Sequence, residues 1–201
     1  MEEGITFHSE SCDLEGLLDQ SSPDNAVIIT HPHPLYGGNM YNNVVELIQR
    51  VYRDKAYTTL RFNFRGTGRS QGKYADGTGE QKDVCAAVEF IAGLGMETIS
   101  LAGYSFGAWI NALATRGDIA VRHQVMVSPP VGFIDFKEIN NIRGLRLVVT
   151  GSRDDIAPPE NIQKMMPIWN PEATFKIING ADHFYGGYSK ALEAVLSTHL
   201  Q

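Results

Sequence analysis

Apolar residues along the chain switch repeatedly between the spacing typical of strands and the spacing typical of helices. Short runs of β-branched and other apolar residues, bounded by glycine, proline, asparagine or aspartate, predict strands. These runs are residues 5–10, 13–19, 26–31, 57–64, 98–105, 123–130, 146–151 and 174–180. Segments in which apolar residues recur every three or four positions predict helices between them. These segments are residues 42–55, 79–95, 106–116, 158–169 and 188–200.

This alternation predicts an α/β fold with a mostly parallel central sheet and helices on both faces. The first two strands follow each other so closely that we expect them to form a hairpin. Right-handed crossovers place the carboxyl ends of parallel strands on one edge of a sheet, which is where such sheets bind ligands. The loops after residues 30, 103, 150 and 178 should therefore converge, and the chemistry that they carry should indicate the function.

Composition and charge narrow the class of protein. A length of 201 residues suits one domain, which we expect to span residues 1–201. The net charge of −6 argues against a nucleic-acid partner, because a phosphate backbone requires a basic protein face. No apolar run is long enough to span a bilayer, and the first residues lack the pattern of a signal peptide, so we predict a cytoplasmic protein without a membrane partner. Cys12 and Cys85 do not make a disulfide framework and are expected to be reduced thiols.

A G-x-S-x-G pentapeptide at residues 103–107 carries the first chemical signal. It follows a predicted strand and opens a predicted helix, which is the context of a nucleophile elbow with Ser105 as nucleophile. Glycines on either side let strand and helix approach closely around a strained turn. The helix N-terminus would then direct free N–H groups at the site where an anion forms. A glycine-rich turn with an incidental serine would give the same pattern. The motif therefore indicates a nucleophile only if a base and an acid accompany it.

Two later loops at the same sheet edge supply those partners. His183 follows the strand at 174–180 and is a candidate general base, because a serine hydroxyl is a poor nucleophile without one. Asp154 and Asp155 follow the strand at 146–151, and either carboxylate could orient the imidazole. Each of the three groups thus follows a separate predicted strand.

The loop at residues 31–39, His-Pro-His-Pro-Leu-Tyr-Gly-Gly-Asn, is the candidate source of one oxyanion donor. The backbone N–H of Phe106, next to the candidate nucleophile, should supply the other. Proline has no N–H to donate, so we favour His33 by its distance from the strand end, with Leu35 as the alternative. His31 and His33 also suggest a metal site, but no third ligand is evident in the loop and such a site would leave Ser105 unexplained.

These residues together resemble the α/β-hydrolase superfamily, and in particular its small lidless serine hydrolases near the dienelactone-hydrolase-like and carboxylesterase groups. The order nucleophile, acid and base is that of this superfamily. The matching segments are 31–40, 60–72, 103–107, 151–158 and 180–184. The resemblance implies an α/β-hydrolase fold. It also implies that Asp154 is the acid, because relatives carry it in a G-x-x-D-x-x-V-P pattern, although Ala157 stands here where valine is common.

Two departures from the family pattern limit what can be carried over. His-Pro-His-Pro replaces the usual His-Gly-x loop, which leaves the second oxyanion donor open. Dienelactone hydrolases use a cysteine nucleophile where this chain has Ser105, so their substrate is not implied. The chain between Ser105 and Asp154 is too short for a large cap domain, which predicts an open, shallow site.

Several other residues are candidates for a structural or a functional role. Arg65 and Arg69 are expected to anchor their loop, with contact to an acidic substrate as the alternative. Capping and first-turn roles are predicted for Asp76, Glu80 and Asp83. Aromatic candidates for lining the site, or for packing in the core, are Trp109, Phe133, Phe136 and Tyr185.

The predicted function is hydrolysis of a small-molecule carboxylic ester through a Ser-His-Asp triad and an acyl-enzyme, without a metal or organic cofactor. A peptidase or a thioesterase with the same triad is the alternative among enzymes. A non-catalytic binding protein on the same scaffold is the alternative outside them.

Overall fold

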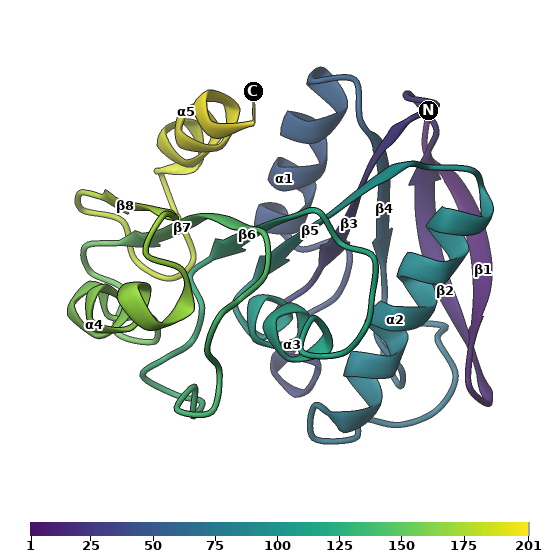
Figure 1. Ribbon diagram of the computed structural model, residues 1–201, viewed down its shortest axis with the longest axis horizontal. Helices are drawn as coiled ribbons and strands as arrows, with labels where there is room; N and C mark the ends of the chain where they lie inside the picture. The colour runs from purple at the N-terminus through teal and green to yellow at the C-terminus, as the bar shows by residue number, and fades with distance from the viewer. Residues whose placement is uncertain (201) are drawn as a thin grey trace.

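The predicted alternation of strands and helices is present in the structure, a computed structural model that describes residues 1–200 (Figure 1). Gln201, the last residue of the predicted domain, lies outside the described residues. The strands are β1 (Glu3–Ser9), β2 (Cys12–Asp19), β3 (Asn25–Thr30), β4 (Thr58–Phe62), β5 (Thr98–Tyr104), β6 (His123–Val127), β7 (Leu145–Gly151) and β8 (Thr174–Ile178). The helices are α1 (Asn43–Asp54), α2 (Thr78–Gly93), α3 (Phe106–Ala114), α4 (Pro159–Trp169) and α5 (Ser189–His199), with a short 3₁₀ turn, η1 (Pro34–Tyr36).

One eight-stranded sheet forms the centre of the molecule, in the order β1-β2-β4-β3-β5-β6-β7-β8. β1 and β2 make the expected antiparallel hairpin, and β2 also pairs antiparallel with β4. The strands from β4 to β8 in this order all run parallel. The mostly parallel sheet predicted from the sequence is therefore confirmed.

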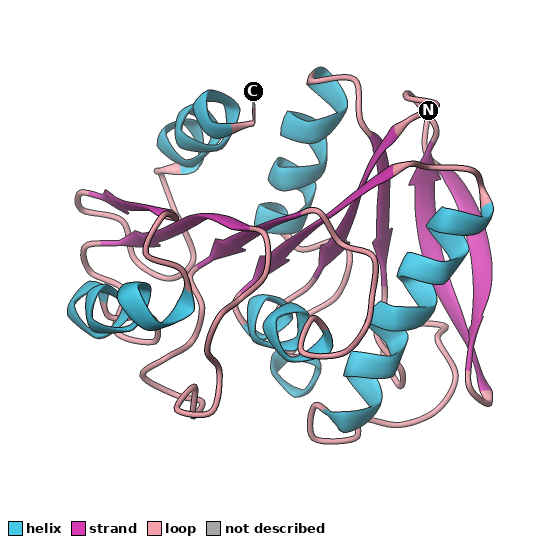
Figure 2. Cartoon of the chain, viewed as in Figure 1, coloured by secondary structure: helices cyan, strands magenta, loops and turns pink. Residues whose placement is uncertain are grey.

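Helices cover both faces of the sheet (Figure 2). Side chains alternate along β3, so that Val27 and Ile29 pack with α1 and α5 while Ile28 packs on the opposite face with α2 and α3. Helix α4 joins this second face farther along, against β6 and β7. Because parallel strands are buried on both sides, they read as continuous apolar runs in the sequence.

β4 is added to the sheet on one side of β3, whereas β5 and the strands after it are added on the other side. This reversal in strand order positions the site. α1, which follows β3, lies on one face, whereas α3, which follows β5, lies on the other. β3 and β5 are neighbours in the sheet, so their carboxyl ends form the crevice at which open α/β sheets bind ligands. Residues 128–144, which connect β6 to β7, contain no helix or strand, so no cap domain is inserted there.

A buried ion pair between Arg65 and Asp83 ties the loop after β4 to α2. The fully buried Asp83 carboxylate accepts hydrogen bonds from Arg65 Nη2 at 2.8 Å, from the Arg65 backbone N–H at 3.0 Å and from Ser9 Oγ at 2.7 Å. Arg65 thus anchors its loop as predicted. The capping role predicted for Asp83 is wrong, because its carboxylate is occupied by the guanidinium. Glu80 does cap α2, by accepting from the N–H groups of Ala75 and Gly77.

Replacing Asp83 with asparagine should lower the free energy of unfolding by about 3 kcal/mol, because it leaves the buried guanidinium with only the half-exposed Glu10 carboxylate, 3.4 Å from Arg65 Nη2, as a counter-charge. Urea denaturation measures this change. Lys82→Gln is the matched control, since the pair of Lys82 with Glu10 is exposed and its loss should cost less than about 1 kcal/mol. Equal effects of the two substitutions would contradict this account of the ion pair.

Candidate active site

Ser105 lies on a sharp turn between β5 and α3. Its backbone has φ 54° and ψ −121°, a strained conformation for a residue with a side chain. Two glycines make the turn possible: a Cβ on Gly103 would lie 2.5 Å from the backbone of Ala108, and one on Gly107 would lie 2.5 Å from the carbonyl oxygen of Thr30. The Ser105 N–H donates to Val127 O at 2.9 Å, which fixes the turn against β6. The sequence context of a nucleophile elbow is thus reproduced in the backbone.

Three side chains from separate loops form one hydrogen-bonded path beside this turn. Ser105 Oγ lies 2.9 Å from His183 Nε2, and His183 Nδ1 lies 2.9 Å from Asp154 Oδ1 and 3.0 Å from Oδ2. All three residues are buried. The loops after β5, β7 and β8 therefore converge at the carboxyl edge of the sheet.

Asp154, and not the neighbouring Asp155, is the carboxylate that contacts the imidazole. Asp154 Oδ1 also accepts from the backbone N–H groups of Ile156, at 3.1 Å, and Ala157, at 2.7 Å. Burial raises the pKa of Asp154, but the hydrogen bond and charge of His183 and the donors around the carboxyl outweigh it, so this pKa lies below its usual range. The group is therefore ionised at neutral pH. Asp155 is exposed.

Three buried hydroxyl groups lie around this arrangement, and of the residues that carry them the sequence indicates only Tyr185, as a candidate for lining the site. Tyr104 donates from its hydroxyl to the backbone oxygen of His183 at 2.8 Å. Ser128 Oγ lies 2.8 Å from Tyr185 Oη, and both residues have positive φ, 47° and 56°. Tyr104 is the x before serine in the G-x-S-x-G motif, and Ser128 and Tyr185 follow strands at the same edge. Their position after strands at that edge could have indicated that these residues lie near the site. It does not identify their hydrogen-bond partners.

The backbone N–H groups of His33 and Phe106 are free to act on a ligand. Neither donates to another residue in the described part of the chain, and both residues line the cavity above Ser105. The Leu35 N–H, the alternative donor, is instead bound to His33 Nδ1 at 3.2 Å. The geometry therefore favours His33 over Leu35 as the second donor.

His31 and His33, which also suggested a metal site, use their ring nitrogens in local hydrogen bonds. His31 Nε2 accepts from the Phe64 N–H at 3.1 Å, so its Nδ1 carries the proton and donates to Pro32 O at 2.6 Å. Burial lowers the pKa of His31 to about 4. His33 Nδ1 accepts from Leu35, and its Nε2 lies 3.2 Å from Tyr74 Oη. Among residues 1–200 no three His, Cys, Asp or Glu side chains are grouped so as to hold a metal ion.

A cavity of about 350 Å³ opens above Ser105. Among the aromatic candidates, Phe133 lines it. Phe136 is buried in the core with α4, and Trp109 packs on the ring of Phe106 at 5.5 Å. Tyr185 is buried behind the site, on Ser128.

The chain resembles known proteins over nearly its whole length. A model of the alpha/beta hydrolase family matches residues 27–198. An uncharacterized protein of Rickettsia prowazekii (strain Madrid E) is 34% identical over 210 residues, which cover 96% of this chain and 88% of that protein. Within residues 1–200, no helix combines the length and the apolar character needed to cross a membrane.

Solved structures agree with this match. An alpha-beta serine hydrolase homologue from Coxiella burnetii is 31% identical with a TM-score of 0.90, covering 99% of this chain and 97% of its own. A serine hydrolase without a lid from Xanthomonas campestris is 28% identical with a TM-score of 0.90, covering 99% of this chain and 93% of its own. The resemblance to small lidless hydrolases is thus confirmed, and the chain belongs to the alpha/beta hydrolase family.

Proposed function

We propose that this chain is a serine hydrolase that cleaves small carboxylic esters by acyl transfer. In this proposal Ser105 is the nucleophile, His183 the general base and Asp154 the acid that orients the base. The observation that carries it is the continuous path from Ser105 Oγ to His183 Nε2, at 2.9 Å, and from His183 Nδ1 to Asp154 Oδ1, at 2.9 Å. These lengths are within the reach that proton transfer requires.

The protonation states follow from the partners of the imidazole. The ionised Asp154 only accepts hydrogen bonds, so His183 Nδ1 must carry the proton that it donates. His183 Nε2 then has a free lone pair and accepts from the Ser105 hydroxyl. The imidazole is thereby held in the one tautomer that acts as a base towards the serine.

The first half of the reaction forms an acyl-enzyme. Ser105 Oγ attacks the ester carbonyl carbon while its proton moves to His183 Nε2. The carbonyl oxygen becomes negative and receives hydrogen bonds from the N–H group of Phe106, at the N-terminus of α3, and from that of His33, in the loop after β3. The bond from carbon to the alcohol oxygen then breaks, and the alcohol leaves with the proton from His183.

The second half releases the acid. Water adds to the acyl carbon and gives its proton to His183 Nε2. The bond to Ser105 Oγ breaks, the serine recovers its proton from the imidazole, and the carboxylic acid departs. The imidazole passes on each proton that it accepts, to the alcohol in the first half and to Ser105 in the second, so it is neutral again at the end of each cycle.

A comparison of leaving groups tests the ester assignment. Purified protein is assayed with 4-nitrophenyl butyrate, butyryl-CoA and an aminoacyl 4-nitroanilide, and each rate is divided by the spontaneous hydrolysis rate of that compound. We expect the ester to be preferred by about tenfold or more. Preference for the thioester or the anilide would reassign the substrate class. No turnover of any of them, with no labelling by a fluorophosphonate, would indicate a binding protein.

A further inference from the structure

Two aromatic side chains at the mouth of the cavity are more exposed to solvent than is usual for large apolar side chains. Tyr36 is 74% exposed and Phe133 is 60% exposed. Their rings nevertheless contact each other edge to face, with centroids 5.9 Å apart. They come from different loops, Tyr36 from η1 after β3 and Phe133 from the connection between β6 and β7. Large aromatic surface left in water at the mouth of a site is typical of a surface that a ligand covers.

These two rings continue a row of aromatic rings that begins beside Ser105. The buried ring of Phe106 lies 4.7 Å from the imidazole of His33, which lies 4.9 Å from the ring of Tyr36. Burial lowers the pKa of His33, against an opposing effect of Asp76, so this imidazole is neutral at neutral pH. The row is therefore uncharged from the floor of the cavity to its rim.

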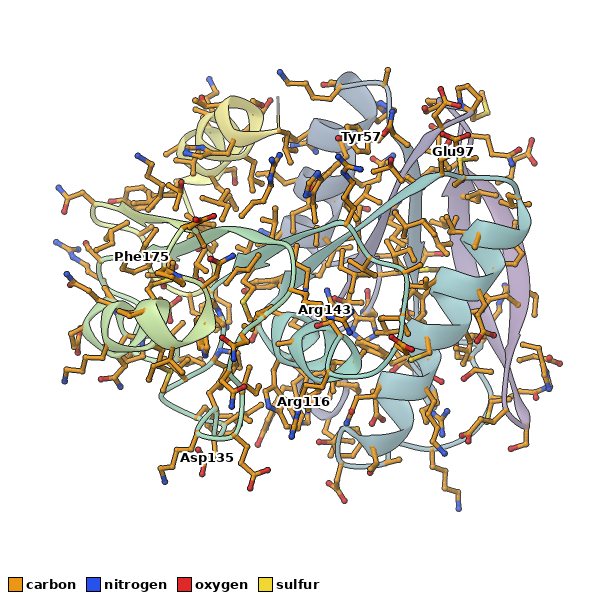
Figure 3. The ribbon with its side chains drawn as sticks, in the orientation of Figure 1. Tyr57, Glu97, Arg116, Asp135, Arg143 and Phe175 are labelled. Carbon is orange, nitrogen blue, oxygen red and sulfur yellow. The ribbon has the colours of Figure 1, made fainter. Side chains whose placement is uncertain are left out.

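The rest of the cavity wall is also free of formal charge. Its lining residues include no Asp, Glu, Lys or Arg. The two segments that form most of the wall, residues 31–42 and 123–134, likewise contain none of these residue types. The first charges beyond Phe133 are those of Asp135, which Figure 3 shows at the outer tip of its connection, and Lys137, and they pair with each other at 3.4 Å.

The turn that carries Tyr36 is held in place before any ligand arrives. His33 O accepts from the N–H groups of Tyr36, at 3.1 Å, and Gly38, at 3.0 Å. A Cβ on Gly38 would lie 2.0 Å from Pro32 O, so the close packing of this turn requires glycine there. A ring on a preorganised turn loses little freedom when it binds, which favours its use as a specificity element.

We infer that the Tyr36–Phe133 pair is a subsite for an uncharged, apolar substrate chain of an ester, and that it excludes substrates with a carboxylate or phosphate on that chain. This inference rests on the proposed function. An alkyl chain leaving Ser105 along the row would bury the exposed faces of both rings. A carboxylate in the same place would lose its water shell and find no cation in the wall to replace it.

Matched pairs of esters test this subsite. The specificity constant kcat/KM is measured for 4-nitrophenyl acetate, for the hexanoate, and for the mono-adipate, whose chain has the same length but ends in a carboxylate. We expect the hexanoate to exceed the mono-adipate by about tenfold or more. In Tyr36→Ala and Phe133→Ala the ratio of hexanoate to acetate should fall severalfold, whereas Phe133→Leu should keep most of it. Phe133→Lys should raise the mono-adipate relative to the hexanoate.

Tyr41→Ala is the control, because Tyr41 is another exposed aromatic residue from the same loop that does not line this cavity. In this variant the kcat/KM ratios of hexanoate to acetate and of hexanoate to mono-adipate should match those of the unaltered protein. Equal kcat/KM for the hexanoate and the mono-adipate would overturn the subsite, as would an unchanged ratio of hexanoate to acetate in both alanine variants. In either case hydrolysis of the acetate would still support the proposed function. Failure to hydrolyse any of the three esters would overturn both.

Discussion

Replacing Ser105 with alanine is expected to lower kcat for ester hydrolysis by about 10⁴–10⁶-fold while the fold stays intact. Without the hydroxyl there is no oxygen to form the acyl-enzyme, and the base at His183 has nothing to activate except water. The free N–H groups of Phe106 and His33 remain, so a small residual rate above the uncatalysed one is also expected. Steady-state kinetics with a 4-nitrophenyl ester measure the loss.

A second serine on the same strand makes a suitable control for this substitution. Ser100 is also buried, but it lies farther from the carboxyl end of β5 and does not line the cavity. Ser100→Ala should keep kcat within severalfold of the unaltered protein. A loss of less than tenfold in Ser105→Ala, with an unchanged circular dichroism spectrum, would remove Ser105 from the role of nucleophile.

The second large effect is expected for Asp154→Asn, which should lower kcat by about 10⁴-fold. Two backbone N–H groups, those of Ile156 and Ala157, donate to Asp154 Oδ1. The amide oxygen of asparagine would take this position, and its NH₂ group would replace Oδ2, which lies 3.0 Å from His183 Nδ1. The imidazole would then accept at Nδ1 and carry its proton at Nε2, the tautomer that cannot accept the proton of Ser105.

Asp155→Asn is the natural comparison, because it makes the same chemical change on an adjacent residue whose side chain is exposed. It should leave kcat within about twofold, since the Asp155 side chain does not line the cavity and does not contact the imidazole. If both variants lost activity equally, or if Asp154→Asn stayed active, the orienting role would belong elsewhere.

Much of the fold was predictable because the energetics of a parallel sheet leave a direct pattern in the sequence. β3 is bounded by turn residues and is apolar because it is buried on both faces, and α1 has its apolar residues on the stripe that packs against the sheet. The order of Ser105, Asp154 and His183 after separate strands then placed them at one edge. Two glycines around Ser105 stand where the backbone has no room for a Cβ.

The remaining features depend on contacts that sequence spacing does not encode. Asp83 resembles a residue of the first helical turn, but its partner is Arg65, and this pairing depends on how α2 packs beside the loop after β4. The choice between His33 and Leu35 as a donor turns on whether the imidazole of His33 accepts from Leu35, which spacing does not reveal. Likewise, nothing in the sequence places Tyr36 against Phe133, because the two residues are far apart along the chain.

Identification of the residue that a fluorophosphonate modifies tests the proposed function most directly. The protein is treated with a small fluorophosphonate, digested, and examined by peptide mass spectrometry, with His183→Ala treated in parallel. We expect one adduct per chain, on the hydroxyl of Ser105, and a much slower reaction in the variant, because the base that removes the proton is missing. An adduct on a different residue, or no adduct in protein shown to be folded, would contradict the account.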